Sequence, residues 1–145
     1  MLYDNAQLLS VFSKAYKVFK EPRFKEELYN VYNFLDLKMS SPNNLIYSSI
    51  SADTNYEDGS KEEGDFYVWN KNELKQVLKQ DYKWVSDYYS INDKGYWEKE
   101  NYVFIQTISD KEFASNINLE LNQFKEKLKL VNKKLYNFRE KRIKP

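Results

Sequence analysis

Carboxylates are the side chains in this sequence whose type and spacing could do chemistry, and they gather between positions 53 and 65. An oxygen-rich loop of this kind could hold a hard cation, or could supply a general acid and a general base. It could also be an ordinary solvated hairpin loop, as most acidic loops are. The group consists of Asp53, Asn55, Glu57, Asp58, Glu62, Glu63 and Asp65.

The spacing of these residues excludes an EF-hand calcium loop. Such a loop needs Gly at its sixth position and a bidentate Glu at its twelfth. Counted from Asp53, those positions hold Asp58 and Gly64. A looser hard-cation site stays as an alternative, but most acidic loops are solvated, so we predict no metal site and no cofactor.

Two carboxylates could instead act on a glycosidic bond, which requires a separation of roughly 5 to 10 Å between them. Asp53 is the candidate catalytic residue because it directly follows a predicted strand, and a strand end is a rigid support. Glu57 and Asp58 lie at the expected loop tip, where the backbone is more mobile.

The remaining composition narrows the possible chemistry and the possible partners. The 145 residues include no Cys and no His, and the net charge is +1. Thiol catalysis and histidine acid–base chemistry are thereby excluded in this chain. No overall field attracts nucleic acid or an anionic membrane, and we predict neither partner. Without an apolar run of about 18 residues or a signal peptide, we expect a cytoplasmic protein.

Aromatic residues offer a second kind of binding chemistry. The chain has 13 Tyr and 3 Trp. Because Tyr has both a stacking face and a hydroxyl, these residues could line a sugar-binding cleft. They could equally lie at the edge of a hydrophobic core.

The elements that must position these side chains follow from hydrophobic periodicity. The pattern predicts an αα-hairpin over 4–39, with Pro22 in the first turn of its second helix. A β-hairpin is expected over 45–69, where "LIYSSIS" would pair with "DFYVW". Asn70 and Glu73 have the spacing of a capping box, which predicts a helix from about 71 to 79. With a second one expected in "YKWVSDYYSI", short helices are predicted over 71–90.

A long C-terminal helix is expected at about 115–141, and it carries a narrow apolar seam. The seam favours packing on its own domain, while a coiled-coil partner or self-association is the alternative. The basic end "REKRIKP" reads as a solvated helix end. The seam consists of Ile117, Leu121, Phe124, Leu128, Val131, Leu135 and Phe138.

Five ordered stretches resemble an internal portion of the spermatogenesis-associated protein 20-like family. They are "MLYDNAQLL", "IYSSISADT", "EEGDFYVW", "WEKENYVF" and "REKRIKP". Members of that family are similar to one another in having a thioredoxin-like domain followed by an (α/α)6 toroid. The toroid resembles the N-acylglucosamine 2-epimerase and six-hairpin glycosidase folds. The resemblance implies one mainly α domain over 1–145, a fragment of that toroid with a short inserted β-hairpin.

The departures from the family limit what the resemblance implies. The thioredoxin-like portion is missing, so a redox function is not implied. Ser51 stands where the family usually has Asp, and Phe104 replaces a residue that is often His. Related epimerases use His as acid or base, so we expect the isolated chain to be inactive. Carbohydrate processing is implied by likeness of fold alone.

The resemblance also implies which residues would wall a carbohydrate-type pocket. Each of them has a structural alternative: a helix cap for the first three, core packing for the aromatic pair, and an ion pair for the glutamate. The implied substrate-binding residues are Tyr3, Asp4, Asn5, Tyr67, Trp69, Glu98 and Asn101, beside the catalytic candidate Asp53.

Three functional hypotheses follow from the sequence. The first is a partial toroid that bears part of a carbohydrate pocket. The second is a non-catalytic interaction module, which would bind the remainder of a toroid or a copy of itself. The third is a free-standing hydrolase that uses Asp53 and an acidic partner.

Overall fold

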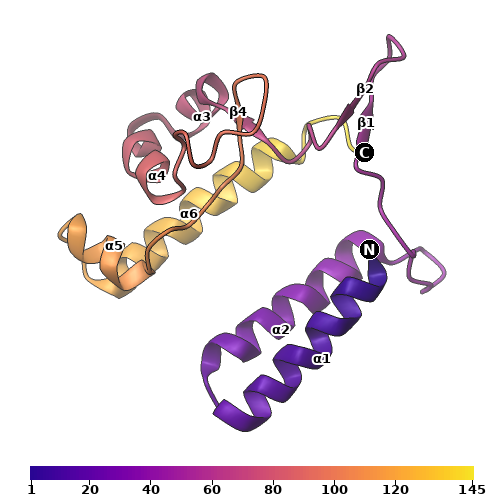
Figure 1. Ribbon diagram of the computed structural model, residues 1–145, viewed down its shortest axis with the longest axis horizontal. Coiled ribbons are helices and arrows are strands. Elements are labelled where there is room, and N and C mark those ends of the chain that lie inside the picture. The colour runs from indigo at the N-terminus through magenta and orange to yellow at the C-terminus, as the bar shows by residue number, and fades with distance from the viewer. The chain divides into compact units, whose positions relative to one another are not determined.

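The first helices of the chain form an antiparallel hairpin. Helix α1 (Leu2–Phe19) ends where Lys20 adopts a left-handed conformation, with φ of 56°. Helix α2 (Pro22–Phe34) begins with Pro at its first turn, as expected, and continues into a π-helical turn, η1 (Leu35–Met39). The short connection forces the two helices to lie side by side, as Figure 1 shows.

The computed structural model describes residues 1–145, which divide into two compact units, residues 1–51 and 52–145. The family resemblance implied one partial toroid domain over the same residues. The helical hairpin and the segment that follows it make up unit 1. All of the β-strands and helices α3 to α6 lie in unit 2.

A β-hairpin opens unit 2, but its strands are not the predicted ones. Strand β1 (Asp53–Asn55) pairs antiparallel with β2 (Lys61–Glu63). The predicted pairing of "LIYSSIS" with "DFYVW" is wrong. The acidic segment itself forms the two strands, because Gly59, with φ of +84°, lets the chain reverse inside that segment.

A second small sheet joins β3 (Trp69–Asn70) to β4 (Asn101–Tyr102), again antiparallel. Directly after β3, Asn70 and Glu73 form the predicted capping box at the start of α3 (Lys71–Leu78). A 3₁₀ turn, η2 (Lys79–Asp81), leads into α4 (Tyr82–Tyr88). The chain is thus mainly helical, as predicted, with two small antiparallel sheets.

The C-terminal helix is shorter than the sequence suggested. Helix α5 (Asp110–Asn116) is a separate element, and α6 (Leu121–Arg139) begins only after a break. Asn118 in the break has φ of 55°, a left-handed conformation that interrupts a helix. A new capping box between Glu120 and Gln123 then starts α6.

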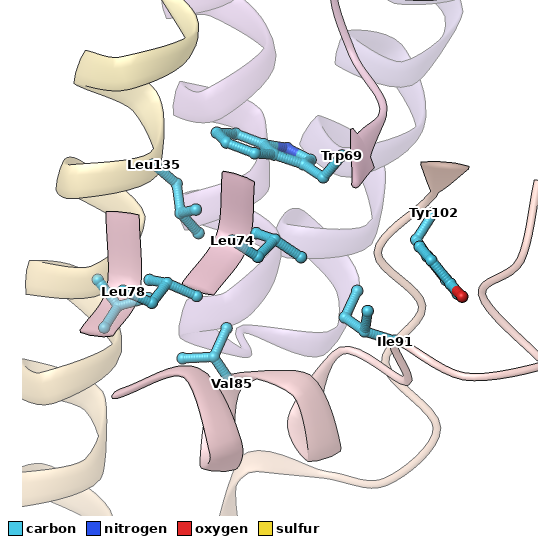
Figure 2. Packing of buried hydrophobic residues seen from close by; sticks show 8 residues of the cluster. Trp69, Leu74, Leu78, Val85, Ile91, Tyr102 and Leu135 are labelled. Atoms are coloured by element: carbon cyan, nitrogen blue, oxygen red, sulfur yellow. The ribbon is translucent and has the colours of Figure 1, made fainter. Parts of the chain in front are cut away.

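The core of unit 2 forms where α3, α4 and β3 pack on one side of α6. Figure 2 shows Trp69, Leu74, Leu78, Val85 and Leu135 converging from these elements. A second cluster gathers Tyr88, Phe113, Ala114 and Phe124 from α4, α5 and α6.

The seam of the C-terminal helix is therefore part of this core. Phe124, Val131 and Leu135 are buried, and Ile117, Leu128 and Phe138 pack against the buried clusters. Self-association through the seam, as the sequence allowed, is not supported, because helices of the same unit already cover it. Packing on its own domain, the alternative reading, is what the structure has.

Candidate functional site

The tip of the β1–β2 hairpin is an ordered turn. Tyr56 N–H donates to Ser60 O at 3.0 Å, and Gly59 N–H donates to Tyr56 O at 3.0 Å. The Asp58 carboxylate accepts hydrogen bonds from the Ser60 hydroxyl at 2.7 Å and the Ser60 amide at 2.9 Å. These two bonds hold the pKa of Asp58 below its ordinary value. Asp58 is therefore an ionised acceptor at the hairpin tip.

A second turn, over residues 97–101, faces the hairpin. Trp97 N–H donates to Asn101 O at 2.9 Å, and Asn101 N–H donates to Glu98 O at 2.7 Å. Lys99 and Glu100 are both left-handed, with φ of 48° and 62°. Such a conformation costs a residue other than Gly about 1–2 kcal/mol. Strain of this kind tends to persist where surrounding contacts enforce it, often at functional sites.

An ion pair joins the 97–101 turn to strand β2 of the hairpin. Lys99 Nζ lies 2.7 Å from Glu62 Oε2, and both side chains are largely exposed. An exposed pair contributes about 0–1 kcal/mol to stability, so its main effect here is to orient two side chains. The same pair raises the pKa of Lys99, chiefly through the hydrogen bond to Glu62.

Between the two turns lies an open cleft of about 370 Å³. Acidic side chains dominate its walls, with Lys99 as the one basic residue. Trp97 is also in the wall, and this residue is 58% exposed. The lining residues are Tyr56, Asp58, Ser60, Glu62, Glu63, Asp65, Val68, Trp97, Glu98, Lys99 and Asn101.

A second depression of about 310 Å³ adjoins the cleft and shares Tyr56, Asp65, Val68 and Asn101 with it. The Tyr56 hydroxyl donates a short hydrogen bond to Asp65. That bond, with burial and the negative charge of Asp65, raises the pKa of Tyr56 to about 12. The tyrosine therefore remains a protonated donor at neutral pH and fixes Asp65 between the two depressions.

The arrangement suits recognition of hydroxyl groups better than acid–base chemistry. An exposed indole offers an apolar face, while carboxylates and the Asn101 amide accept and donate hydrogen bonds. Small-ligand sites commonly combine an aromatic surface with a few polar groups that fix orientation.

Two residues predicted from the sequence line this cleft, and three nearby candidates do not. Glu98 and Asn101 lie in its walls. Asp53, the catalytic candidate, stands at the start of β1 opposite Glu63 and is not among the lining residues. Tyr67 is an exposed residue in a turn, and Trp69 is buried in the core.

The predicted side-by-side placement of Tyr67 and Trp69 fails for a local reason. Tyr67 N–H donates to Gly64 O at 2.8 Å, which makes this segment a turn instead of a strand. Tyr67 is 46% exposed while Trp69 is 3% exposed, so they do not share a face. Trp69 takes the alternative role of a core residue.

The remaining candidates, Tyr3, Asp4 and Asn5, belong to unit 1, in the first turns of α1. Asp4 lies 3.5 Å from the terminal amino group, and the Asn5 amide donates to Met1 O at 2.8 Å. Tyr3 is 60% exposed. These contacts are those expected of residues at the start of a helix.

Sequence reasoning missed Trp97, Tyr56 and Lys99. Trp97 and Lys99 stand beside Glu98 in "WEKEN", but the approach of this turn to the hairpin depends on contacts distant in sequence. Tyr56 lies inside the acidic segment, and only the actual strand register brings it beside Asp65. No three acidic side chains come together in a group that could hold a metal ion. No helix has the length and apolar character needed to cross a membrane.

Comparison with known proteins shows that the chain is similar to parts of much longer proteins. It is 28% identical over 165 aligned positions to uncharacterized protein B0495.5 of Caenorhabditis elegans, covering 100% of this chain and 22% of that protein. It is 32% identical over 79 positions to mouse spermatogenesis-associated protein 20, covering 54% of this chain and 10% of that protein. The human protein of that name is 30% identical over 79 positions.

No family model matches the chain. It spans 22% of the worm relative's length and 10% of the mouse relative's length. What these findings establish is a distant, partial relationship to spermatogenesis-associated protein 20.

Proposed function

We propose that unit 2 binds a carbohydrate-type ligand in the cleft between the β1–β2 hairpin and the 97–101 turn. The observation that carries the proposal is the exposed Trp97 ring beside carboxylates and the Asn101 amide, within one open cleft. A sugar ring presents apolar C–H faces that stack on indole, and hydroxyls that donate to carboxylates.

The proposal describes a binding site and not a complete active site. Asp53 does not line the cleft, and the chain has no His to act as acid or base. The family resemblance supports a wider proposal, in which this chain is part of an (α/α)6 toroid whose pocket needs further segments. We therefore expect binding without turnover by the isolated chain.

Calorimetric titration with a panel of neutral mono- and disaccharides tests the proposal. At least one sugar should bind. Glu98→Gln should lower the affinity for that sugar, because the variant removes a carboxylate that lines the cleft. Glu57→Gln is the control, since Glu57 is an exposed carboxylate of the neighbouring β1–β2 hairpin that does not line the cleft. Equal weakening by both variants, or no binding by any sugar, would contradict the proposal.

A second candidate function is an interaction module, and one observation in unit 1 favours it. Neither α1 nor α2 has a buried residue. Val11, Val18 and Phe19 on α1 are 58%, 71% and 63% exposed. A helix face of this kind needs a cover, because an amphipathic helix gains most of its stability from packing.

Helical segments of a longer protein are the occupant that we propose for this face. The relatives extend far beyond the matched part, since the chain spans 22% of the worm protein. When the chain is alone, the uncovered face should pair with copies of itself. Sedimentation velocity should therefore show association that rises with concentration, and a clean monomer over a wide range would remove this candidate.

A further inference from the structure

The segment after α6 inserts one arginine into the depression that adjoins the proposed binding cleft. Arg142 Nη1 donates to Val68 O at 2.7 Å and to Phe66 O at 2.9 Å, with a longer contact to Asp65 O at 3.4 Å. Its Nη2 donates to Glu73 Oε2 at 2.9 Å. One guanidinium thus binds backbone carbonyls of the 65–68 turn and the carboxylate of Glu73 on α3.

The guanidinium also stacks on the ring of Trp69. Arg142 Cζ lies 4.2 Å from the centroid of that ring, and the Arg142 side chain is only 16% exposed. Arginine suits such a position because its planar fork donates in several fixed directions and stacks on aromatic faces. Lysine has one ammonium group and cannot reproduce this pattern.

The backbone that delivers Arg142 is itself ordered. Lys141 N–H donates to Phe138 O at 3.1 Å, and Arg142 N–H donates to Arg139 O at 2.9 Å. The chain therefore continues past the end of α6 in a hydrogen-bonded turn. The basic end that the sequence presents as solvated instead has its second arginine half-buried.

The carbonyls that Arg142 binds belong to a turn between two sheets. Strand β2 ends at Glu63 and β3 begins at Trp69, so residues 64–68 are outside both ladders. Buried or half-buried carbonyls need a donor, and leaving them without one costs free energy. Arg142 supplies that donor for Phe66 and Val68.

This turn carries two residues of the candidate site. Asp65 and Val68 line both the cleft and the depression beside it, and Arg142 lines the second of these. Asp65 is also the acceptor for the Tyr56 hydroxyl. Movement of the 64–68 turn would therefore displace the wall that the two depressions share.

We propose that residues 140–145 form a latch, in which Arg142 holds the 64–68 turn and so positions the wall of the binding cleft. Arg142 is a positioning residue, because it acts through Asp65 and Val68. The effect on ligand affinity rests on the proposed carbohydrate function. The mechanical part of the latch, the restraint of the turn, does not.

Hydrogen exchange followed by mass spectrometry tests the mechanical part without any ligand. Arg142→Ala should speed exchange of the Tyr67 amide by about tenfold, because this amide donates to Gly64 O within the restrained turn. The Gly64 amide, which starts the turn and donates to Ala52 O, should exchange faster as well. The α5 amides, from the other cluster, should keep their rates. Lys141→Ala is the control, since Lys141 is the exposed neighbour on the same segment.

Arg142→Lys separates fork geometry from positive charge and guards against a variant that loses its fold. It should also speed exchange at 64–68, though less than Arg142→Ala does. Added methylguanidinium should slow that exchange again in Arg142→Ala only. Unchanged rates at 64–68 in Arg142→Ala would overturn the latch, as would an equal rise in α5, which indicates general unfolding.

Titration with a sugar that binds the unaltered chain then tests the positioning role. Arg142→Ala should weaken binding about tenfold, which corresponds to a loss of about 1.4 kcal/mol of preorganisation. Unchanged affinity alongside faster exchange would overturn the positioning role. If no sugar binds the unaltered chain, the proposed function fails, while the exchange rates still decide the latch.

Discussion

At the scale of single residues, the hydroxyl of Tyr56 and the carboxylate of Asp65 make the most informative contact. It joins the β1–β2 hairpin to the turn that Arg142 restrains. Of the residues that the sequence proposed for a pocket, Glu98 and Asn101 reach the same cleft. The chemistry of the site thus depends on side chains whose neighbours come from distant parts of unit 2.

Tyr56 gives a prediction for alkaline pH. Its folded-state pKa is raised from 10.0 to about 12. A raised pKa means that the contact stabilises the fold fully below about pH 10 and that this contribution is lost as the pH rises through about 12. Urea unfolding of the unaltered chain and of Tyr56→Phe should differ most below pH 10 and converge toward pH 12. A difference that stays constant over this range would contradict the assignment.

At the scale of elements, Gly95 decides where the 97–101 turn lies. Its amide donates to Asn92 O at 3.0 Å, and its carbonyl accepts from Val103 N–H at 2.8 Å. A Cβ at this position would meet Ser90 O at 2.3 Å and Val103 O at 2.8 Å. Both obstacles are backbone atoms, so only Gly fits without movement of the chain.

Gly95→Ala should therefore destabilise unit 2 by about 1–3 kcal/mol, the usual cost of forcing extra atoms into a packed site. Because the turn carries Trp97 and Asn101, it should also weaken ligand binding. Gly59→Ala is a useful comparison, since no atom lies within 4 Å of a Cβ there and only its φ of +84° opposes the change. Denaturant unfolding measures both, and a Gly95→Ala variant as stable as the unaltered chain would refute the close approach.

Local signals predicted the helices better than the strands. Pro22 and the Asn70–Glu73 capping box act within a few residues, so the starts of α2 and α3 could be predicted. The strands could not, because β-branched and aromatic residues at 45–51 favour a strand only where a partner is available. Residues 45–51 found no such partner, whereas the acidic segment reverses at Gly59 and pairs its own two halves, β1 with β2.

At the scale of the whole molecule, the two units differ in their hydrophobic cores: unit 2 has a substantial core, and unit 1 has few buried hydrophobic residues. In unit 2, helices α3, α4 and α5 pack on α6, so the apolar seam of α6 is buried within the unit. In unit 1, the buried hydrophobic residues are Leu35 and Met39, both of η1. This difference is why the binding proposal concerns unit 2 and the interaction proposal concerns unit 1.

The sequence could therefore predict a mainly helical chain and its distant relatives, but only part of the candidate site. Periodicity reveals that a helix has an apolar face, and not which element covers it. The seam from Ile117 to Phe138 could equally have met a partner. Trp97 could not be placed from the sequence, because its position depends on the Lys99–Glu62 pair and on the packing of Gly95.

The most direct test of the carbohydrate-type cleft is the fluorescence of Trp97 during a sugar titration. Of the three tryptophans only Trp97 lines the cleft, and it is 58% exposed. Trp69 is 3% exposed and Trp84 packs against the core clusters, so a ligand in the cleft should change mainly the Trp97 emission. The account predicts a saturable change that disappears, together with binding, in Trp97→Ala and persists in Tyr136→Ala, an exposed aromatic residue on α6. Undiminished sugar binding by Trp97→Ala would contradict it.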